Sequence, residues 1–281
     1  PELQKAYSVP ITGGTITQLP SYELPVIDCG GGGGGDEEEV ARIFIDDRGT
    51  PNKNELYSES TSGIVTKISQ ALGPDGDVFT FERTPDGEHV VYSADVQNDR
   101  AELFVVPSAG GTITKISTAP TVFDDGTSSD VIRFVISPNG QRVAYAADPN
   151  EWTKYELYSV ALTGGTAARI SHQLPFDYDV DDFKFSPSSQ RVIYRAGRTS
   201  IGLWELYSTP STSAGAVRIS QEMETGQNVP QNGFEISCNS ATTYFLADLV
   251  GGAAPILYSV PTTGGTITEV GGGQLPGNIC S

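Results

Sequence analysis

The stretch ELYSVALTGGTAARIS, residues 156–171, is one of six copies of a repeated segment in the chain, called here the ELYS segment. Close copies read ELFVVPSAGGTITKIS (102–117), ELYSTPSTSAGAVRIS (205–220) and ILYSVPTTGGTITEV (256–270). A shorter form, ELYSESTSGIVTKIS, begins at residue 55, and LQKAYSVPITGGTITQLP (3–20) stands near the start. An internal repeat decides the fold, because each copy is one supersecondary unit that buries its apolar face against its neighbours.

A second recurring segment precedes most copies of the first. It reads FERTPDGEHVVYSAD (81–95), FVISPNGQRVAYAAD (134–148), FKFSPSSQRVIYRAG (183–197) and FEISCNSATTYFLAD (234–248). Each version predicts a strand, a polar turn and a second strand. The ELYS segment predicts a third strand and ITKIS a fourth, and glycine in the GGT turn permits the positive φ of a tight hairpin.

Four antiparallel strands about every 50 residues, without helical periodicity, are typical of a β-propeller blade. The competing repeat architecture is a solenoid, which usually has shorter rungs and needs capping repeats at both ends. The combined pattern FxxSPxGxRVxYxAD…ELYSVPxxGGTxxxIS resembles the TolB-type propeller repeat, a relative of the WD-type repeat without its Trp-Asp dipeptide. The resemblance covers nearly the whole chain and is clearest between residues 77 and 220. It implies a propeller and an extracytoplasmic location (periplasmic, secreted or cell surface), whereas the activity stays open.

The blade count follows from the repeats and from the two ends of the chain. Residues 1–20 predict the third and fourth strands of a closing blade, and LPGNIC (275–280) repeats LPVIDC (24–29) and predicts its first strand. We therefore expect an all-β, six-bladed propeller whose closing blade combines 1–20 and 271–281, so that no sheet edge stays open. The five other blades are expected at 21–70, 71–118, 119–171, 172–220 and 221–270.

The second strand of the closing blade is not accounted for by this count. Three alternatives follow: the blade has three strands, the sequence is cut from something longer, or another molecule supplies the strand. In the last case neighbouring copies could assemble through their closing blades. The start at Pro1 without a methionine favours a mature, trimmed or excised segment.

The net charge of −18 argues against several classes of partner. Nucleic acids are polyanions that require clustered Lys and Arg, and anionic membrane surfaces also attract basic segments. No run approaches the roughly 18 apolar residues that a membrane span needs. The expected partner is a protein or a glycan on the loop-rich face, since variable loops on a rigid scaffold commonly carry binding sites.

Aspartate recurs just before the predicted innermost strand of three blades. Aligning the blades on the proline of the SP-type turn places Asp77, Asp130 and Asp179 at one position, near one mouth of the channel. Such carboxylates can bind Ca²⁺, which takes about 6–8 oxygen ligands. In the alternative, each Asp accepts backbone N–H bonds in the turn between blades. Three further carboxylates lie close by in the sequence, the first a binding candidate and the others metal candidates: Asp125, Asp177 and Asp181.

Two aromatic residues in the loops of the same face are further binding candidates. Trp152 and Tyr178 could stack on a sugar or anchor a protein partner, or could instead cover the rim of their own blade.

No catalytic constellation is recognised in the sequence. GxSxG, HExxH and Walker motifs are absent, and His172 has no Cys or His close to it in the sequence. We therefore expect a noncatalytic binding or assembly scaffold. The alternative is an enzyme, either a polysaccharide lyase or hydrolase that uses carboxylates alone, or the gating domain of a peptidase.

The three cysteines fall at equivalent positions, where other blades have the proline after the first strand. A disulfide from Cys280 to Cys29 or Cys238 would strengthen ring closure in an oxidising compartment. Unpaired, buried cysteines are the other interpretation.

Overall fold

The computed structural model describes residues 7–8, 17–18, 39–96, 100–117, 131–148, 154–175, 178–198, 202–249 and 254–276. All secondary-structure elements in these ranges are β-strands. A helix able to cross a membrane is not found in the described part of the chain.

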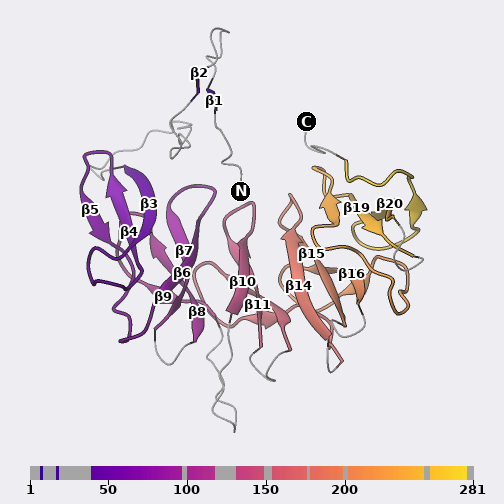
Figure 1. Ribbon diagram of the computed structural model, residues 1–281, viewed down its shortest axis with the longest axis horizontal. Helices are drawn as coiled ribbons and strands as arrows, with labels where there is room; N and C mark the ends of the chain where they lie inside the picture. Colours follow the sequence, from indigo (N-terminus) through magenta and orange to yellow (C-terminus); the bar gives the residue numbers. More distant parts are fainter. Residues whose placement is uncertain are drawn as a thin grey trace.

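Five antiparallel sheets stand one after another along an arc, from the indigo first sheet to the yellow-gold fifth (Figure 1). The first sheet contains β3 (Val40–Asp46), β4 (Glu55–Ser60) and β5 (Val65–Lys67). The first strand predicted for this blade, at 24–29, lies outside the described residues.

The other four sheets have four strands each, in sequence order. The second sheet contains β6 (Val78–Arg83), β7 (His89–Asp95), β8 (Ala101–Pro107) and β9 (Thr114–Lys115). The third contains β10 (Val131–Ile136), β11 (Arg142–Ala147), β12 (Glu156–Ala161) and β13 (Ala168–Arg169). The fourth contains β14 (Tyr178–Phe185), β15 (Arg191–Arg198), β16 (Leu203–Pro210) and β17 (Val217–Arg218). The fifth contains β18 (Phe234–Ile236), β19 (Thr242–Ala247), β20 (Ile256–Pro261) and β21 (Thr268–Glu269).

A separate pair of short strands repeats the outer half of these sheets. β1 (Tyr7–Ser8) pairs with β2 (Thr17–Gln18) in the register Tyr7↔Gln18. The third and fourth strands of the third sheet use the same spacing, Tyr158↔Arg169. This hairpin lies apart from the five sheets (Figure 1), and ring closure with six blades stays a prediction.

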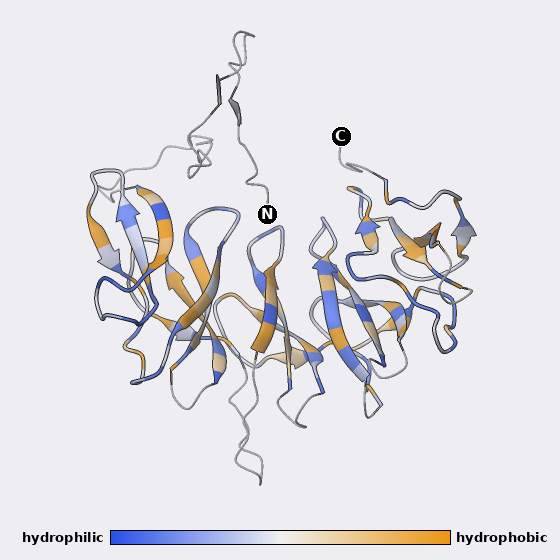
Figure 2. Ribbon diagram, in the orientation of Figure 1, coloured by the Kyte–Doolittle hydropathy of each residue, from blue (hydrophilic) through white to orange (hydrophobic). Residues whose placement is uncertain are grey.

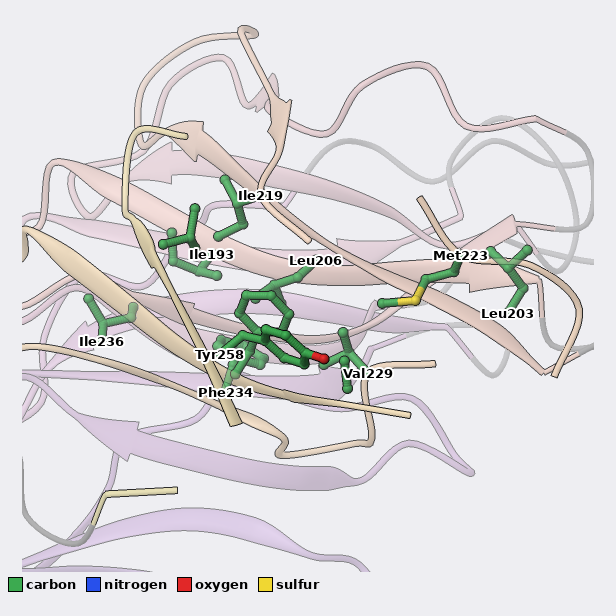
Figure 3. Packing of buried hydrophobic residues seen from close by; sticks show 12 residues of the cluster. Ile193, Leu203, Leu206, Ile219, Met223, Val229, Phe234, Ile236 and Tyr258 are labelled. Carbon is green, nitrogen blue, oxygen red and sulfur yellow. The ribbon is translucent and has the colours of Figure 1, made fainter. Parts of the chain in front are cut away.

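Apolar side chains fill the spaces between consecutive sheets, because successive residues of a strand point to opposite faces. In the third sheet, Leu157 packs against the fourth sheet, and its neighbour Tyr158 packs back against the second. Figure 2 shows the corresponding apolar segments along the strands. Figure 3 shows the cluster between the fourth and fifth sheets, which includes Leu206, Ile219 and Phe234.

The GGT turn requires glycine for two reasons, its backbone conformation and its close contact with the preceding sheet. Gly164 and Gly165 have φ values of 87° and 110°, a region that glycine enters without steric cost. A Cβ on Gly164 would also lie only 3.1 Å from Cγ2 of Thr114 in the second sheet. The turn of each such blade therefore lies close to the blade before it.

The Glu at the start of the ELYS segment and the basic residue near its end form an ion pair between the third and fourth strands of a sheet. In the third sheet, the Glu156 carboxylate accepts from the Tyr158 hydroxyl at 3.0 Å and pairs with Arg169 at 2.9 Å. Equivalent ion pairs occur in three other sheets: Glu55 with Lys67, Glu102 with Lys115, and Glu205 with Arg218. The fifth sheet departs from this pattern, because Ile256 replaces the Glu and Glu269 replaces the cation.

Candidate functional site at the mouth of the inner strands

The first predicted aspartate connects the first two sheets. Asp77 immediately precedes β6, and its Oδ1 accepts the backbone N–H of Asn54 at 2.6 Å. The next residue, Val78, donates its N–H to the carbonyl of Asn54 at 2.9 Å. Asn54, which immediately precedes β4, is thereby held by two hydrogen bonds to the start of the second sheet.

Asp179 makes the same clamp two junctions further on, between the third and fourth sheets. Its Oδ1 accepts the N–H of Tyr155 at 3.0 Å, while Val180 donates to the Tyr155 carbonyl at 2.9 Å. At the next junction, Val229 donates to the carbonyl of Trp204 at 2.9 Å. The described aspartates thus have the structural arrangement in which each carboxylate caps a backbone N–H between blades.

The calcium hypothesis also involves positions outside the described residues, namely Asp125, Asp130 and Asp177. Within the described ranges, no three Asp, Glu, His or Cys side chains gather as a metal-binding group. Calcium binding at the mouth therefore stays a prediction.

The structure describes one of the two aromatic candidates. Tyr178 begins β14 and is half-buried, with the Arg198 guanidinium 5.9 Å from its ring centroid. Trp152 lies outside the described residues.

A β-bulge interrupts the first strand of the second, third and fourth sheets near the start of the strand. The register shifts between Val78 and Thr80, and equivalent shifts occur in β10 and β14. A bulge adds one residue to one strand and redirects its side chain. The bulged positions are Phe79, Ile132 and Asp181.

At this bulge position, the second and third sheets present large apolar groups to solvent. Phe79 is 56% exposed and Ile132 is 49% exposed. The two side chains occupy the same place in adjacent repeats, beside the start of the inner strands. They form what we call the apolar mouth pair.

The fourth sheet has charged groups in the corresponding region. Asp182 is fully buried and accepts from Arg133 Nη1 of the third sheet at 2.8 Å. Its other oxygen accepts the backbone N–H of Asn232, which precedes the fifth sheet, at 2.9 Å. One carboxylate therefore connects three consecutive sheets.

A second ion pair lies next to the first. Arg195 pairs with Asp181, donates to the Val229 carbonyl at 2.6 Å and stacks over the Trp204 ring at 3.9 Å. Burial raises the pKa of the Asp181 carboxyl and lowers the pKa of the Arg195 guanidinium, and the pair opposes both shifts. Asp181 Oδ1 is shielded from solvent and accepts no hydrogen bond.

The described histidine at the end of the third sheet has a packing role. His172 Nδ1 lies 2.8 Å from the Tyr194 hydroxyl, and its ring stacks on Tyr207 at 4.4 Å. Burial lowers the pKa of His172, which favours the neutral ring. Neither of its aromatic neighbours is activated, since burial raises the pKa of both tyrosines.

A pocket of about 410 Å³ lies between the first and second sheets. Its lining combines hydroxyl and apolar side chains, including Ser58, Ile64 and Pro107, and contains no charged residue. It therefore presents no side chain that acts as an acid or a base.

Cys238, which follows β18, is disulfide-bonded. The other two cysteines of the chain, Cys29 and Cys280, lie outside the described residues. The pairing itself stays a prediction.

The ion pair between Arg133 and Asp182 and the contact of Arg195 with Trp204 were not predicted from the sequence. Trp204 is the second residue of β16 and carries Arg195 on its ring. A usable signal was present: Arg133 and Asp182 both precede the phenylalanine of the inner strand in adjacent repeats. Opposite charges at equivalent positions of neighbouring blades indicate an ion pair between them.

Comparison with known proteins gives similarity of fold at low identity. No family model and no curated protein matches the chain. Among solved structures, a putative TolB from Agrobacterium tumefaciens is 17% identical with a TM-score of 0.46, over 76% of this chain and 73% of that one. A prolyl endopeptidase is 14% identical with a TM-score of 0.52, over 79% of this chain. Prolyl oligopeptidase B from Galerina marginata is 13% identical with a TM-score of 0.51, over 70%.

These similarities concern the repeat architecture alone. The chain spans 33% and 31% of the length of the two peptidases. It has an all-β fold of five antiparallel sheets, consistent with a propeller and similar in fold to part of each of the two peptidases.

Proposed function

We propose that this chain is a noncatalytic, extracytoplasmic binding or assembly scaffold. It uses the loop-rich face of a six-bladed propeller that both chain ends close. The observation that carries the proposal is the difference between the polar and the apolar side chains at the described mouth. There the polar groups hold neighbouring sheets together, while the apolar mouth pair, Phe79 and Ile132, stays exposed.

The engaged polar groups argue against chemistry at this mouth. Asp77 and Asp179 accept backbone N–H groups, and Asp182 is buried against Arg133. A general acid or base must reach a substrate proton, and these carboxylates are directed at the protein itself.

The apolar mouth pair favours a protein or glycan partner. Single exposed apolar residues are common on protein surfaces, but here two large ones occupy the same bulge in adjacent repeats. Aromatic and aliphatic anchors surrounded by polar groups are typical of binding surfaces. The clamp at Asp77 holds the strand that carries Phe79, so little conformational freedom would be lost there on binding.

A matched pair of double variants tests the proposal. Phe79→Ser with Ile132→Ser removes the mouth pair, and Val65→Ser with Val217→Ser removes two valines on outer strands that are 38% and 40% exposed. Both variants and the parent chain are screened against a glycan array and a displayed peptide library. We expect the mouth variant to lose at least about tenfold in affinity for selected ligands, and the outer variant to retain it. Equal loss in both, or no loss in either, would overturn the mouth as the binding site.

The enzyme alternative is tested by assaying turnover of polysaccharides that contain the glycans of the array. Turnover by the parent chain that Asp130→Asn or Asp179→Asn abolishes, with an unchanged melting temperature, would overturn the noncatalytic proposal. For calcium at Asp77, Asp130 and Asp179, calorimetry and melting in millimolar Ca²⁺ are decisive. Absence of heat and of a rise in melting temperature would assign these residues to structure alone.

A further inference from the structure

One position of the repeat holds an arginine at two junctions between sheets and a valine at another. It is the residue that pairs with the last residue of the ELYS strand, on the strand before it in the chain. Arg142 holds this position beside β12, and Arg191 holds it beside β16. In the first sheet Val40 pairs with the last residue of β4. The register therefore makes these three positions equivalent.

Each arginine binds a serine hydroxyl of its own sheet. Arg142 Nε donates to the Ser159 hydroxyl at 3.0 Å and to the Ser211 carbonyl of the fourth sheet at 3.1 Å. Arg191 Nε donates to the equivalent hydroxyl, that of Ser208, at 2.7 Å. Burial lowers the pKa of both guanidinium groups, the effect expected of a cation held partly out of water. A guanidinium group is therefore part of both junctions.

The first sheet keeps the serine but not the arginine. Ser58 holds the register position of Ser159 and is 3% exposed. The Val40 side chain has no donor to offer it. In the second sheet both members change together, because His89 holds the arginine position and Val105 holds the serine position. Among the described junctions, the first is thus the one that retains this acceptor and has lost the arginine.

The pocket between the first two sheets lies at this place. Its volume of about 410 Å³ falls within the range of about 300–1,000 Å³ that is typical of small-ligand pockets. From the second sheet it is lined by Pro107, at the repeat position that precedes Ser211 in the fourth sheet. The lining residues are Val40, Ser58, Ser60, Ile64, Thr66, Pro107, Ala109 and Gly110. The pocket therefore corresponds to the space that Arg142 fills between the third and fourth sheets.

The lining suits a guanidinium group better than an ammonium group. Ser58, Ser60 and Thr66 carry hydroxyl oxygens that can accept hydrogen bonds, while Ile64 and Pro107 provide apolar contact. A guanidinium group is planar and weakly hydrated, and it presents several N–H donors in a fixed arrangement. An ammonium group is a compact, strongly hydrated charge and loses more on entering a neutral pocket.

The charges beside the pocket favour a cation. The exposed Glu39 immediately precedes Val40, and the exposed Glu88 is joined to Ser108, next to Pro107 in the chain, by a backbone hydrogen bond of 2.8 Å. Arg83 has the opposite charge, and its N–H groups donate to a carbonyl of its own turn at 2.8 Å and to the Val40 carbonyl at 3.5 Å. The chain has a net charge of −18, which attracts cationic partners.

We propose that this pocket binds a guanidinium group carried by an exposed arginine of a partner protein. The bound group takes the place that Arg142 holds at the equivalent junction, with the Ser58 hydroxyl as an acceptor. The site lies away from the mouth, since β3 begins at Val40 and ends beside the start of β4, which the Asp77 clamp holds. It goes beyond the proposed function, and variants of the apolar mouth pair leave it intact.

Titration of the whole chain with N-acetylarginine amide, followed by the amide resonances of residues 58, 66 and 110, tests the binding. We expect saturable shifts with a dissociation constant on the order of 1 mM for a ligand of this size. N-acetyllysine amide is expected to bind at least about fivefold more weakly. Equal binding of the two, or no shift at these residues, would overturn the guanidinium site.

Free arginine separates the two sources of the same group. Its own carboxylate is brought close to Glu39 and Glu88, whereas an arginine within a protein chain carries no such charge. We expect free arginine to bind about threefold or more weakly than N-acetylarginine amide. Tighter binding of the free amino acid would overturn the partner protein as the source.

Filling the pocket from within gives a test that does not depend on the ligand. Val40→Arg restores the residue of the third and fourth sheets, and we expect it to weaken binding of N-acetylarginine amide at least about tenfold. It should also raise the melting temperature by about 3 °C through a hydrogen bond to Ser58. In a Ser58→Ala background this gain should disappear. A gain of the same size there would show that the added charge alone stabilises the chain, and would overturn Ser58 as the acceptor.

The reverse change opens the equivalent pocket at another junction. Arg142→Ala lowers the melting temperature, and we expect millimolar ethylguanidinium to restore part of this loss, whereas ethylammonium does not. Rescue of Arg142→Ala without binding to the parent chain would overturn the proposal for the first junction alone. Absence of both would overturn the equivalence between the pocket and the arginine position.

Discussion

The first and fourth sheets share the ELYS segment, but an aspartate is buried between sheets in the fourth and is partly exposed to solvent in the first. In the fourth sheet, Asp182 is fully buried and links the third sheet to the segment before the fifth. In the first sheet, Asp46 pairs with Arg48 on an exposed end face. The comparison teaches that the repeat specifies strands and register, whereas the place of a sheet in the array decides what its faces can bury.

The largest expected difference concerns these two aspartates. Asp182→Ala removes the carboxylate that accepts from Arg133 and from the Asn232 N–H, and we expect a loss of about 3 kcal/mol in the free energy of unfolding. Asp46→Ala removes an exposed pair that salt and water already screen, so its effect is expected to be much smaller. Urea denaturation of both variants measures the difference. Equal losses would show that position in the array does not matter.

Most of the described architecture could be predicted from the sequence because it depends on local chemistry. The turn at residues 84–88 and the GGT turns follow from polar and glycine residues, and they separate the strands as expected. The clamp at Asp179 was one of two interpretations of a recurring aspartate, since a short carboxylate commonly caps a backbone N–H.

The mouth could be predicted only in part, because a bulge reverses the alternation of a strand. After the bulge at Asp181, the next residue, Asp182, points into the protein instead of toward solvent. The same insertion leaves Phe79 exposed although the strand pattern is apolar. Pairing between distant repeats, such as Arg133 with Asp182, appears only when the blades are placed side by side.

The second prediction concerns pH and compares the third sheet with the first. Burial lowers the pKa of folded His172, while Glu205 raises it and Arg169 lowers it to smaller extents. The unfolded chain, with a His pKa of about 6.5, then binds the proton first as pH falls. Stability is therefore fully present above pH 6.5 and is lost on acidification, by at most about 1.4 kcal/mol per pH unit.

A natural replacement provides the control for this pH effect. Gln70 occupies the equivalent position after the first sheet and accepts the Tyr92 hydroxyl. We expect His172→Gln to keep stability at pH 8 and to flatten the profile between about pH 5 and 7. Melting curves of the two chains across this range give the difference, in which the carboxylates common to both cancel. Parallel profiles would contradict the assignment of His172.

The third prediction concerns a feature that the terminal and inner junctions share. Asp77→Ala and Asp179→Ala each remove the acceptor of one backbone N–H, and we expect each to cost about 1 kcal/mol. Asp179→Asn should cost less, because its amide oxygen can still accept. Similar losses at both junctions in chemical denaturation are expected, and a loss confined to one would mean that the clamps differ.

The smallest effect is expected from restoring the outer ion pair in the fifth sheet. Ile256 is 38% exposed, and Tyr258 pairs with Glu269 in the register that joins Tyr158 to Arg169. Ile256→Glu with Glu269→Lys recreates the Glu–cation pair of the other sheets, beside a tyrosine hydroxyl that can donate to the new carboxylate. Because the pair is close to solvent, we expect a coupling of about 0.5 kcal/mol in a double-mutant cycle, lost in high salt. Zero coupling at low salt would show that the fifth sheet's outer strands are displaced from the geometry of the inner sheets, and that its departure from the repeat reflects the sheet's terminal place.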